Sequence, residues 1–279
     1  MASTQEISIY KYDHNHFYSK EDVLAVEEPL EISLQYNEGD TKHRQSISIT
    51  MRTPGYDREL ALGFLYTEGI LTNADQVEKV LTVGENQITI CLQAHATIEL
   101  DKLKRNFYTT SSCGVCGKSS IDAIRTIAAD YRLPRMDRCY WNIGVLTSLK
   151  DKINDHQSNF SQTGGIHASA LFDMEGELLS IFEDVGRHNA LDKMIGHYLL
   201  HHSTDLSSHI LLLSGRASFE LIQKAIMAKI RVVCAIGAPS SLAVELAKEF
   251  DITLIGFLKN QSFNIYSGSI DPSIIDLVN

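Results

Sequence analysis

The sequence has no apolar run that approaches the roughly 20 residues needed to span a lipid bilayer. Its first 12 residues include Glu6 and lack the basic and then apolar order of a secretory signal peptide. Low-complexity tracts and internal repeats are absent as well. With 279 residues, of which 44% are apolar, the chain is long enough to bury a sizeable core. We therefore expect a globular, cytoplasmic protein.

Basic residues are in short supply. The chain has 25 Lys and Arg against 35 Asp and Glu, and its formal net charge is −10. Because contact with a phosphate backbone needs clustered Lys and Arg, this balance disfavours a general nucleic-acid-binding function. It leaves room for a local basic pocket that holds one anionic ligand.

Cysteine is scarce too. The five cysteines are an odd number with one close pair, Cys113 and Cys116, which does not suggest a disulfide framework. In a reducing cytosol a close pair is more often a metal or redox site than a structural bridge. Cys91 and Cys234 lie in apolar, strand-like runs and are expected in the core, while Cys139 is uninformative.

The first third of the chain has the pattern of an α+β region. Two apolar runs flank Asn37-Glu38-Gly39-Asp40, a sequence typical of a hairpin turn. A helical pattern opens with acidic residues and closes near Gly69. The predicted elements are strands at residues 30–36, 45–51, 77–83 and 87–92 and a helix at residues 57–67.

From residue 165 onward, apolar strand-like runs alternate with helical periodicity. This order implies right-handed crossovers and a parallel sheet, and such sheets bind ligands at the carboxyl ends of their strands. The predicted strands are residues 169–172, 177–182, 209–214, 231–236 and 252–257, and the predicted helices are residues 189–201, 217–229 and 240–250.

We therefore predict an α/β protein in three parts. These are an N-terminal α+β domain (residues 1–110), a CxxC loop with the helix that follows it (residues 111–135), and a C-terminal α/β domain (residues 136–279).

The pair Cys113-Gly114-Val115-Cys116 is the predicted reactive centre. Both thiols lie in a Gly- and Ser-rich loop just before a predicted helix, where unpaired amides, the helix dipole and Lys118 favour a thiolate. A thiolate is the nucleophile that takes sulfur from a persulfide, and the second thiol is close enough to assist by closing a disulfide.

A structural zinc knuckle is the alternative for this pair. Zinc usually takes four ligands, commonly from two such pairs, and the chain has no second pair. His167 or His188 would have to complete the site through tertiary proximity. We favour reactive thiols and expect no structural metal.

Three glycine-containing turns mark the predicted ligand edge of the C-terminal domain. Gly165 and His167 stand at the mouth of a strand, Arg187 and His188 follow a strand and open a helix, and Gly215-Arg216 repeats that layout. Helix N-termini and guanidinium groups bind anions, so together the turns favour a nucleotide-sized, phosphorylated ligand. For the first turn, a capped turn with a satisfied His remains an equal alternative.

The motifs, taken in order, resemble the FdhD family, the sulfurtransferase accessory proteins of formate dehydrogenase. The resemblance runs from about residue 28 to residue 266, and its joint pattern is far more specific than any single motif. The motifs are residues 112–117, 164–168, 183–193, 214–220 and 242–245.

The resemblance implies a sulfur carrier. Such a protein accepts sulfur from a cysteine desulfurase, holds it as a persulfide, and passes it to the bis(molybdopterin guanine dinucleotide) cofactor of molybdenum or tungsten before insertion into formate dehydrogenase. By motif, Cys113 would carry the persulfide and Cys116 would assist. The family also implies a cytidine-deaminase-like three-layer α/β/α domain at the C-terminus and a homodimer.

The family's cofactor-binding segment corresponds to residues 257–262, where members often carry Gly-Arg in place of Gln261-Ser262. A cationic anchor is thus missing, and Lys259 is the nearest replacement. With the strand-end residues, the predicted cofactor-binding set is Phe257, Leu258, Lys259, Asn260, Gln261, Ser262, His167, Arg187, His188, Gly215 and Arg216.

Three other functions compete with this interpretation. A dithiol oxidoreductase would use the same pair but would not need the strand-end Arg and His turns. A zinc nucleotide deaminase needs a Glu two residues after its His or Cys ligand and a Pro-Cys-x-x-Cys run, and the chain lacks both around His167 and Cys113. A binding chaperone would deliver the cofactor without sulfur chemistry.

Overall fold

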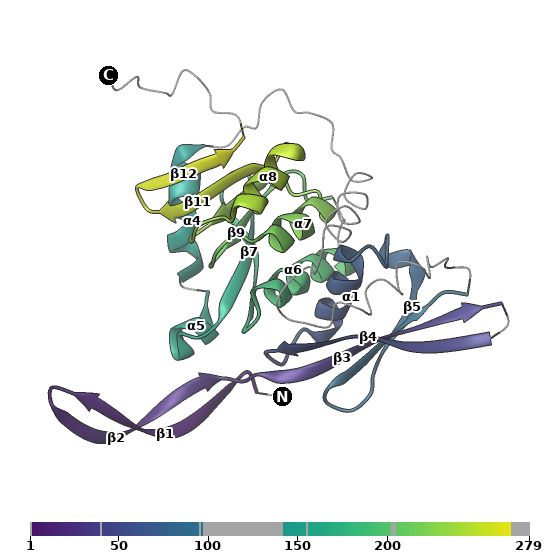
Figure 1. Cartoon of the computed structure of the whole chain (residues 1–279), viewed down its shortest axis with the longest axis horizontal. Helices are drawn as coiled ribbons and strands as arrows, with labels where there is room; N and C mark the ends of the chain where they lie inside the picture. Colours follow the sequence, from purple (N-terminus) through teal and green to yellow (C-terminus); the bar gives the residue numbers. More distant parts are fainter. Residues whose placement is uncertain are drawn as a thin grey trace.

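The computed structural model describes residues 2–39, 41–94, 96, 142–154, 156–201 and 205–268. Cys113 and Cys116 lie outside these residues, as do the predicted domain boundaries at residues 110 and 135, so those predictions remain untested. The described chain contains a two-stranded, a four-stranded and a six-stranded sheet (Figure 1).

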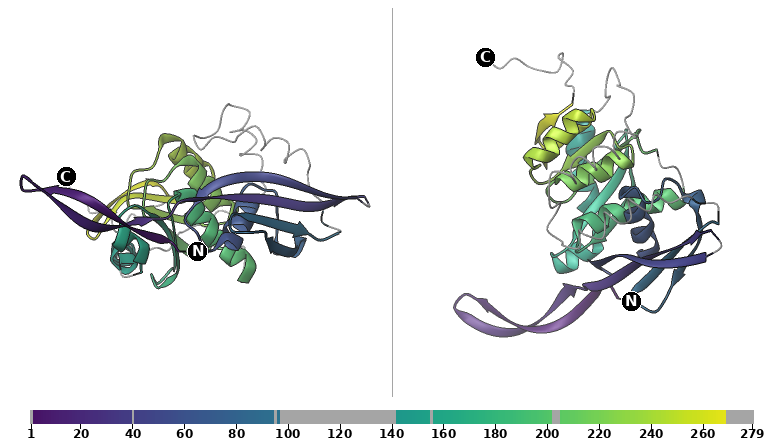
Figure 2. Two further views of the ribbon diagram at one scale, coloured as in Figure 1. Left: turned by 90° about the horizontal axis from the view of Figure 1, so that it is seen from below. Right: turned by 45° about the vertical axis from the view of Figure 1, so that its right-hand side comes forward.

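An N-terminal β-hairpin forms the two-stranded sheet. It pairs β1 (Thr4–Asp13) with β2 (His16–Ala25) through a turn in which His14 and Asn15 have positive φ. The hairpin projects away from the rest of the described chain in all three views (Figures 1 and 2). Nothing in the sequence analysis predicted it.

The four-stranded sheet has the order β4-β3-β6-β5. The hairpin predicted around residues 37–40 is confirmed, the strands predicted at residues 77–83 and 87–92 form a second hairpin, and β3 and β6 join the two hairpins as parallel neighbours. The helix predicted for residues 57–67 is confirmed with the same bounds. The elements are β3 (Glu28–Glu38), β4 (Thr41–Arg52), α1 (Asp57–Thr67), the short 3-10 helix η1 (Ala74–Gln76), β5 (Val77–Thr82) and β6 (Gln87–Leu92).

The six-stranded sheet has the order β12-β11-β10-β9-β7-β8. Its three central strands β9, β10 and β11 are parallel, as predicted, but β7, β8 and β12 run antiparallel to their neighbours, so the sheet is mixed. The strands are β7 (His167–Asp173), β8 (Leu178–Asp184), β9 (His209–Leu213), β10 (Val232–Ala235), β11 (Thr253–Lys259) and β12 (Ser262–Ser267).

Helices cover both faces of this sheet, because successive side chains of a strand point to opposite faces. In β9, Leu211 and Leu213 belong to the core beneath the helices α6, α7 and α8, whereas Ile210 and Leu212 belong to the core beneath α4. The result is a three-layer α/β/α arrangement, in agreement with the predicted fold class. The helices are α4 (Ile143–Asn154), α5 (Ser158–Thr163), α6 (Arg187–His201), α7 (Phe219–Met227) and α8 (Ser241–Glu249).

A helix crossing connects the two larger sheets. Helix α1 packs along α6 (Figure 1), and the backbones touch at Gly63 and Gly196. A Cβ atom on Gly63 would lie 1.9 Å from the carbonyl oxygen of Asp192. One continuous apolar core therefore runs from Leu30 of β3 through α1 to Leu254 of β11. No described helix is long and apolar enough to cross a membrane.

Candidate functional site

One edge of the six-stranded sheet gathers most of the strand-end turns singled out in the sequence. The strands β8, β9, β10 and β11 all end there, and the antiparallel strand β7 begins there. His167, the first residue of β7, is paired with Asp184, the last residue of β8, while Ser169 is paired with Leu213 at the end of β9. The predicted convergence at the carboxyl ends of the strands is thus present.

His167 lies against the turn that follows β9. Two hydrogen bonds hold that turn: the amide of Ala168 donates to Ser214 Oγ at 2.7 Å, and the amide of Ser214 donates to the Ala168 carbonyl oxygen at 3.0 Å. A Cβ atom on Gly215 would lie 3.2 Å from His167 Nδ1, closer than side chains normally approach. Glycine at position 215 therefore permits the close approach of this turn to the His167 ring.

A row of main-chain contacts extends the edge to β11. The amide of Gly237 donates to the carbonyl oxygen of Gly215 at 3.0 Å, and the amide of Phe257 donates to the carbonyl oxygen of Gly237 at 3.1 Å. Phe257 has a φ of 52° and is 43% exposed. Arg216 is exposed in the same row, where its Cγ lies 3.0 Å from the position of a Cβ atom on Gly237.

The electrostatic environment keeps His167 neutral. Burial lowers the pKa of its imidazole below the ordinary 6.5, and the positive charges of Arg187 and His188 lower it further, against a weaker opposing effect of Asp184. A neutral imidazole beside a guanidinium can accept or donate one hydrogen bond. It also gains a proton readily when an anion arrives.

Arg187 is the group at this edge with an unused donor. Its Nε is shielded from solvent and has no hydrogen-bond partner among the described residues. Buried guanidinium donors are rarely left unpaired, so this atom marks a place where a ligand oxygen fits. Contact of Arg187 with an anion stays a prediction.

The acidic residues before Arg187 have structural roles. Both carboxylate oxygens of Glu183 accept from the amides of Asn159 and Phe160 at 3.0 Å, which caps the first turn of α5. Asp184 is fully buried and lies 2.7 Å from Lys193 Nζ. The acidic residues of the motif at residues 183–193 therefore serve to fix the turn.

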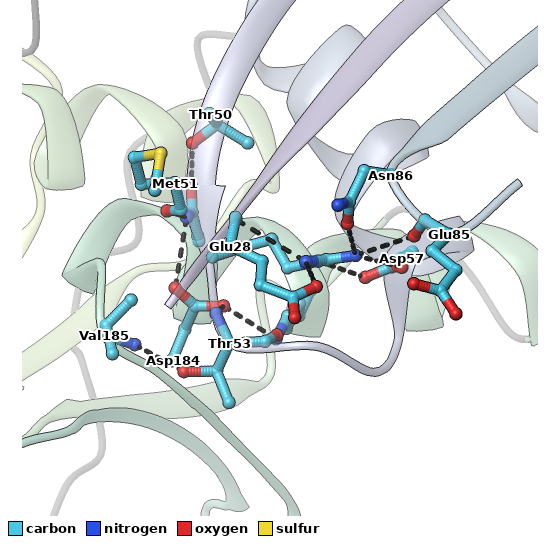
Figure 3. A network of polar contacts seen from close by, with 12 residues as sticks. Glu28, Thr50, Met51, Thr53, Asp57, Glu85, Asn86, Asp184 and Val185 are labelled. Carbon is cyan, nitrogen blue, oxygen red and sulfur yellow. Dashed lines mark hydrogen bonds and ion pairs between the residues drawn. The ribbon is translucent and has the colours of Figure 1, made fainter. Parts of the chain in front are cut away.

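That turn is tied to the end of β4 (Figure 3). The amide of Thr53 donates to Asp184 Oδ2 at 3.1 Å, and the amide of Val185 donates to Thr53 Oγ1 at 3.1 Å. Asn189 donates to the carbonyl oxygen of Met51 at 2.7 Å. The network holds the start of α6, and with it Arg187, against the four-stranded sheet.

Arg52 supports the other side of this junction and was missed by the sequence analysis. Its fully buried guanidinium donates to both carboxylate oxygens of Asp57 at 2.9 and 3.0 Å, and to the carbonyl of Glu85 and the side chain of Asn86 at 3.2 Å (Figure 3). A lone Arg at the end of a strand carries no sequence signal, because its partners come from the start of α1 and from the turn between β5 and β6.

His188 is paired within the protein. Its Nε2 lies 3.3 Å from Ser218 Oγ and 3.8 Å from a carboxylate oxygen of Glu220. The hydrogen bond with His188 lowers the pKa of Glu220 to about 2, although burial opposes that shift. His188 thus joins the start of α6 to the start of α7, and its contact with a ligand stays a prediction.

The predicted segment of residues 257–262 is the end of β11, its turn and the start of β12. Lys259, Gln261 and Ser262 are exposed. Leu258 is fully buried in the core under α4, so its side chain is not available to a ligand. The side-chain amide of Asn260 donates to both carboxylate oxygens of Asp151, at 2.9 and 2.8 Å. These bonds fix the turn against α4.

The structure also describes the first glycine turn and two of the cysteines. Gly164 is the left-handed C-cap of α5, with a φ of 65°, so the first glycine turn does have the capped geometry that the sequence left open. Cys91 and Cys234 are buried, as expected, and burial raises the pKa of the Cys91 thiol.

Comparison with known proteins accounts for these features together. The model of the FdhD/NarQ family matches residues 25–271. The chain belongs to this family. The family match begins at the last residue of β2, so almost the whole projecting hairpin precedes it.

FdhD relatives from bacteria and archaea cover nearly the full chain. The protein named sulfur carrier protein FdhD of Streptomyces avermitilis is 48% identical over 90% of this chain and 89% of its own length. The protein of the same name from Sulfurisphaera tokodaii is 40% identical over 94% of this chain and 96% of its own length.

The fold of this FdhD/NarQ family member also has a solved counterpart. A crystal structure described as a formate dehydrogenase accessory protein from Desulfotalea psychrophila aligns with a TM-score of 0.73. It covers 96% of this chain and 98% of its own chain at 21% identity. At that identity the likeness establishes the fold.

Proposed function

We propose that this protein is a sulfurtransferase that carries a persulfide sulfur on Cys113. It accepts the sulfur from a cysteine desulfurase and transfers it to the bis(molybdopterin guanine dinucleotide) cofactor of molybdenum or tungsten before that cofactor enters formate dehydrogenase. The protein would act in the cytoplasm as a homodimer. Relatives named as sulfur carrier proteins over nine-tenths of this chain support the sulfur chemistry.

Within the structure, the unpaired Nε of Arg187 is the observation that carries the ligand half of the proposal. It lies at the edge where burial and neighbouring positive charge lower the pKa of His167 and where Gly215 packs against the ring. The cofactor presents diphosphate groups and a guanine base, and a guanidinium binds diphosphate oxygens through directed hydrogen bonds. Arg187 and the exposed cations Arg216 and Lys259 would hold the diphosphate groups.

The first chemical step is a thiol exchange. The Cys113 thiolate attacks the outer sulfur of the desulfurase persulfide, a new sulfur–sulfur bond forms, and the desulfurase cysteine leaves as a thiolate. The proton stays on the outer sulfur, so Cys113 becomes a persulfide without net oxidation or reduction. A lowered thiol pKa near Lys118 would provide the nucleophile.

The second step releases that sulfur to the cofactor, which is the substrate. In one route, the Cys116 thiolate attacks the inner sulfur of the Cys113 persulfide, forms a Cys113–Cys116 disulfide and frees hydrosulfide. The disulfide then needs two electrons from a thiol reductant to reset. In the other route, Cys116 attacks the outer sulfur and carries the persulfide itself for a second transfer.

Intact mass measurement tests the proposal. The protein is incubated with a cysteine desulfurase and cysteine, desalted and weighed before and after treatment with a thiol reductant. We expect a gain of one sulfur atom that the reductant removes. The Cys113→Ser variant should gain none, while the matched control Cys139→Ser should gain as much as the unmodified sequence.

The competing functions give different results. A dithiol oxidoreductase would cycle between dithiol and disulfide and retain no sulfur on Cys113. A binding chaperone would support full formate dehydrogenase maturation with Cys113→Ala. Either outcome contradicts the carrier proposal.

A further inference from the structure

A cluster of metal-ligating side chains lies away from the sheet edge. Glu59, His197 and His201 each offer one ligand atom, and these atoms all lie within 4.8 Å of one another. Glu59 is in the first turn of α1, and the two histidines are in the last two turns of α6. The cluster therefore joins the helix that covers the four-stranded sheet to a helix of the six-stranded sheet.

The helix crossing explains why these residues meet. A Cβ atom on Gly196 would lie 1.9 Å from the carbonyl oxygen of Glu59, so the backbone of Glu59 touches α6 one residue before His197. The spacing of four residues puts His197 and His201 on the same face of α6. Two glycines at the crossing thus bring a carboxylate and two imidazoles together.

Neighbouring rings orient His197. Its ring lies 5.3 Å from the ring of Phe182, 5.4 Å from that of Tyr198 in an edge-on arrangement, and 5.1 Å from that of His201. Phe182 is buried and packs edge-on against Tyr56, which precedes α1. His201 is exposed, so an ion can reach the cluster from solvent.

We propose that Glu59, His197 and His201 bind a divalent transition-metal ion, with Zn²⁺ as the cation that fits them best. Two imidazoles and one carboxylate are a common zinc ligand set, with water in the fourth position. Tetrahedral zinc at its usual bond lengths needs ligand atoms about 3.3 Å apart, so small side-chain rotations would close the site. Imidazole ligands disfavour Mg²⁺ and Ca²⁺, which prefer oxygen atoms.

The charges at the cluster suit a cation. His201 is in the last turn of α6, where the negative end of the helix dipole attracts positive charge. Glu59 supplies a full negative charge and offsets the positive end of α1 at the same place. A bound ion would fasten α1 to α6, and this consequence is independent of the proposed sulfur transfer.

The sequence predicts no structural metal, because potential ligands are apparent only around the CxxC pair. Glu59 is far from His197 and His201 in the sequence, and the two histidines alone are a weak signal. The helix crossing brings the third ligand to them, and for that reason the proposal revises the earlier expectation.

The experiment uses the full chain with Cys113→Ser and Cys116→Ser, which removes zinc binding by the close thiol pair. Zn²⁺ is titrated calorimetrically into metal-free protein, and the metal retained after gel filtration is measured. We expect one equivalent to bind. At a zinc concentration about 100 times Kd, the Tm should rise on the order of 5 °C.

His201→Ala and Glu59→Gln test the ligands. His201 is exposed and Gln keeps the shape of Glu, so both variants should fold and keep the metal-free Tm within about 2 °C. Each should weaken zinc binding at least about 100-fold and abolish the Tm rise. His156→Ala, which removes an exposed histidine elsewhere, should bind zinc as the parent does.

Co²⁺ gives a second readout. Cobalt bound at this site should give a visible d–d spectrum without a thiolate charge-transfer band, and His201→Ala should abolish the spectrum. Two results would overturn the proposal: no stoichiometric zinc in the parent, or zinc that binds with equal affinity in His201→Ala and Glu59→Gln.

Discussion

The carboxylate of Asp184 and the ammonium group of Lys193 lie 2.7 Å apart, and both side chains are excluded from solvent. The ammonium group also donates to the carbonyl oxygen of Thr53 at 2.8 Å, so the pair fastens α6 to the end of β4. Burial of two charges is costly, but removal of one partner costs more, because it leaves the other charge uncompensated. Stability of the ligand edge thus depends on this pair.

Lys193→Met should lower the free energy of unfolding by about 3–5 kcal/mol. Urea denaturation followed by circular dichroism measures the change. The matched variant is Lys152→Met, since Lys152 pairs with Glu177 near the surface at 2.9 Å and should cost less than about 1 kcal/mol. Equal losses in the two variants would show that the buried pair has no special role.

Arg187 should contribute to ligand binding and little to the stability of the fold. Because its Nε has no partner among the described residues, Arg187→Gln should change the free energy of unfolding by less than about 1 kcal/mol. Binding of a guanosine diphosphate sugar, used as a probe for the guanine dinucleotide end, should weaken roughly 10- to 100-fold, as expected for a lost charged hydrogen bond. Calorimetry of the unmodified protein and of Arg187→Gln measures the affinity.

Arg44→Gln, which removes an exposed cation from the four-stranded sheet, is the control for general charge effects. It should leave the affinity unchanged. Unaltered probe binding by Arg187→Gln would remove Arg187 from the ligand site while leaving the persulfide proposal to be judged by its own mass measurement.

The crossing of α1 and α6 should tolerate no side chain at its centre. An added Cβ at Gly63 or Gly196 would lie 1.9 Å from a backbone oxygen of the other helix, and no flexible side chain is available there to move aside. Gly196→Ala should therefore destabilise the protein by more than about 4 kcal/mol or prevent folding. Expression level and thermal unfolding report the effect.

Gly39→Ala is the control for Gly196→Ala, because it adds a Cβ atom where no other atom is close. Gly39 has a positive φ of 61° in the β3–β4 turn, but nothing lies within 4 Å of a Cβ atom there. Backbone strain alone should cost about 1 kcal/mol. If Gly196→Ala cost no more than Gly39→Ala, the two helices would have room to separate.

Local elements were predictable because their signals are local. The helix at residues 57–67 follows from its apolar periodicity, its acidic first turn and Gly69, and the turn at residues 37–40 follows from its composition. The strand-end position of Arg187 also followed, because a strand-like run ends just before it and helical periodicity begins there. These features need no knowledge of distant partners.

The features that the sequence did not predict depend on tertiary contacts. The structural roles of Glu183 and Asp184 could not be assigned from the sequence, because their partners Phe160 and Thr53 come from other elements. Leu258 was included in the ligand segment, although the core under α4 buries its side chain. The projecting hairpin lacks an apolar face against a core, which is the pattern that identifies a strand in a sequence.

His167 provides a prediction about pH. In the folded protein, burial and the charges of Arg187 and His188 hold the pKa of His167 below 6.5. As pH falls below about 6.5, the unfolded chain therefore binds a proton that the folded chain resists, and the contribution of this residue to stability declines. His167→Gln should remove that part of the decline in Tm between pH 7.5 and 5.5.

Ligand binding should show the reverse trend. A bound diphosphate adds negative charge near the ring and raises the pKa of His167, so the complex takes up a proton and affinity increases as pH falls through this range. A guanosine diphosphate sugar is the right probe, because its fully esterified diphosphate keeps the same charge. Kd measured from pH 7.5 to 5.5 should decrease in the unmodified protein and change less in His167→Gln. A parallel pH dependence in both proteins would mean that the ligand does not meet this imidazole.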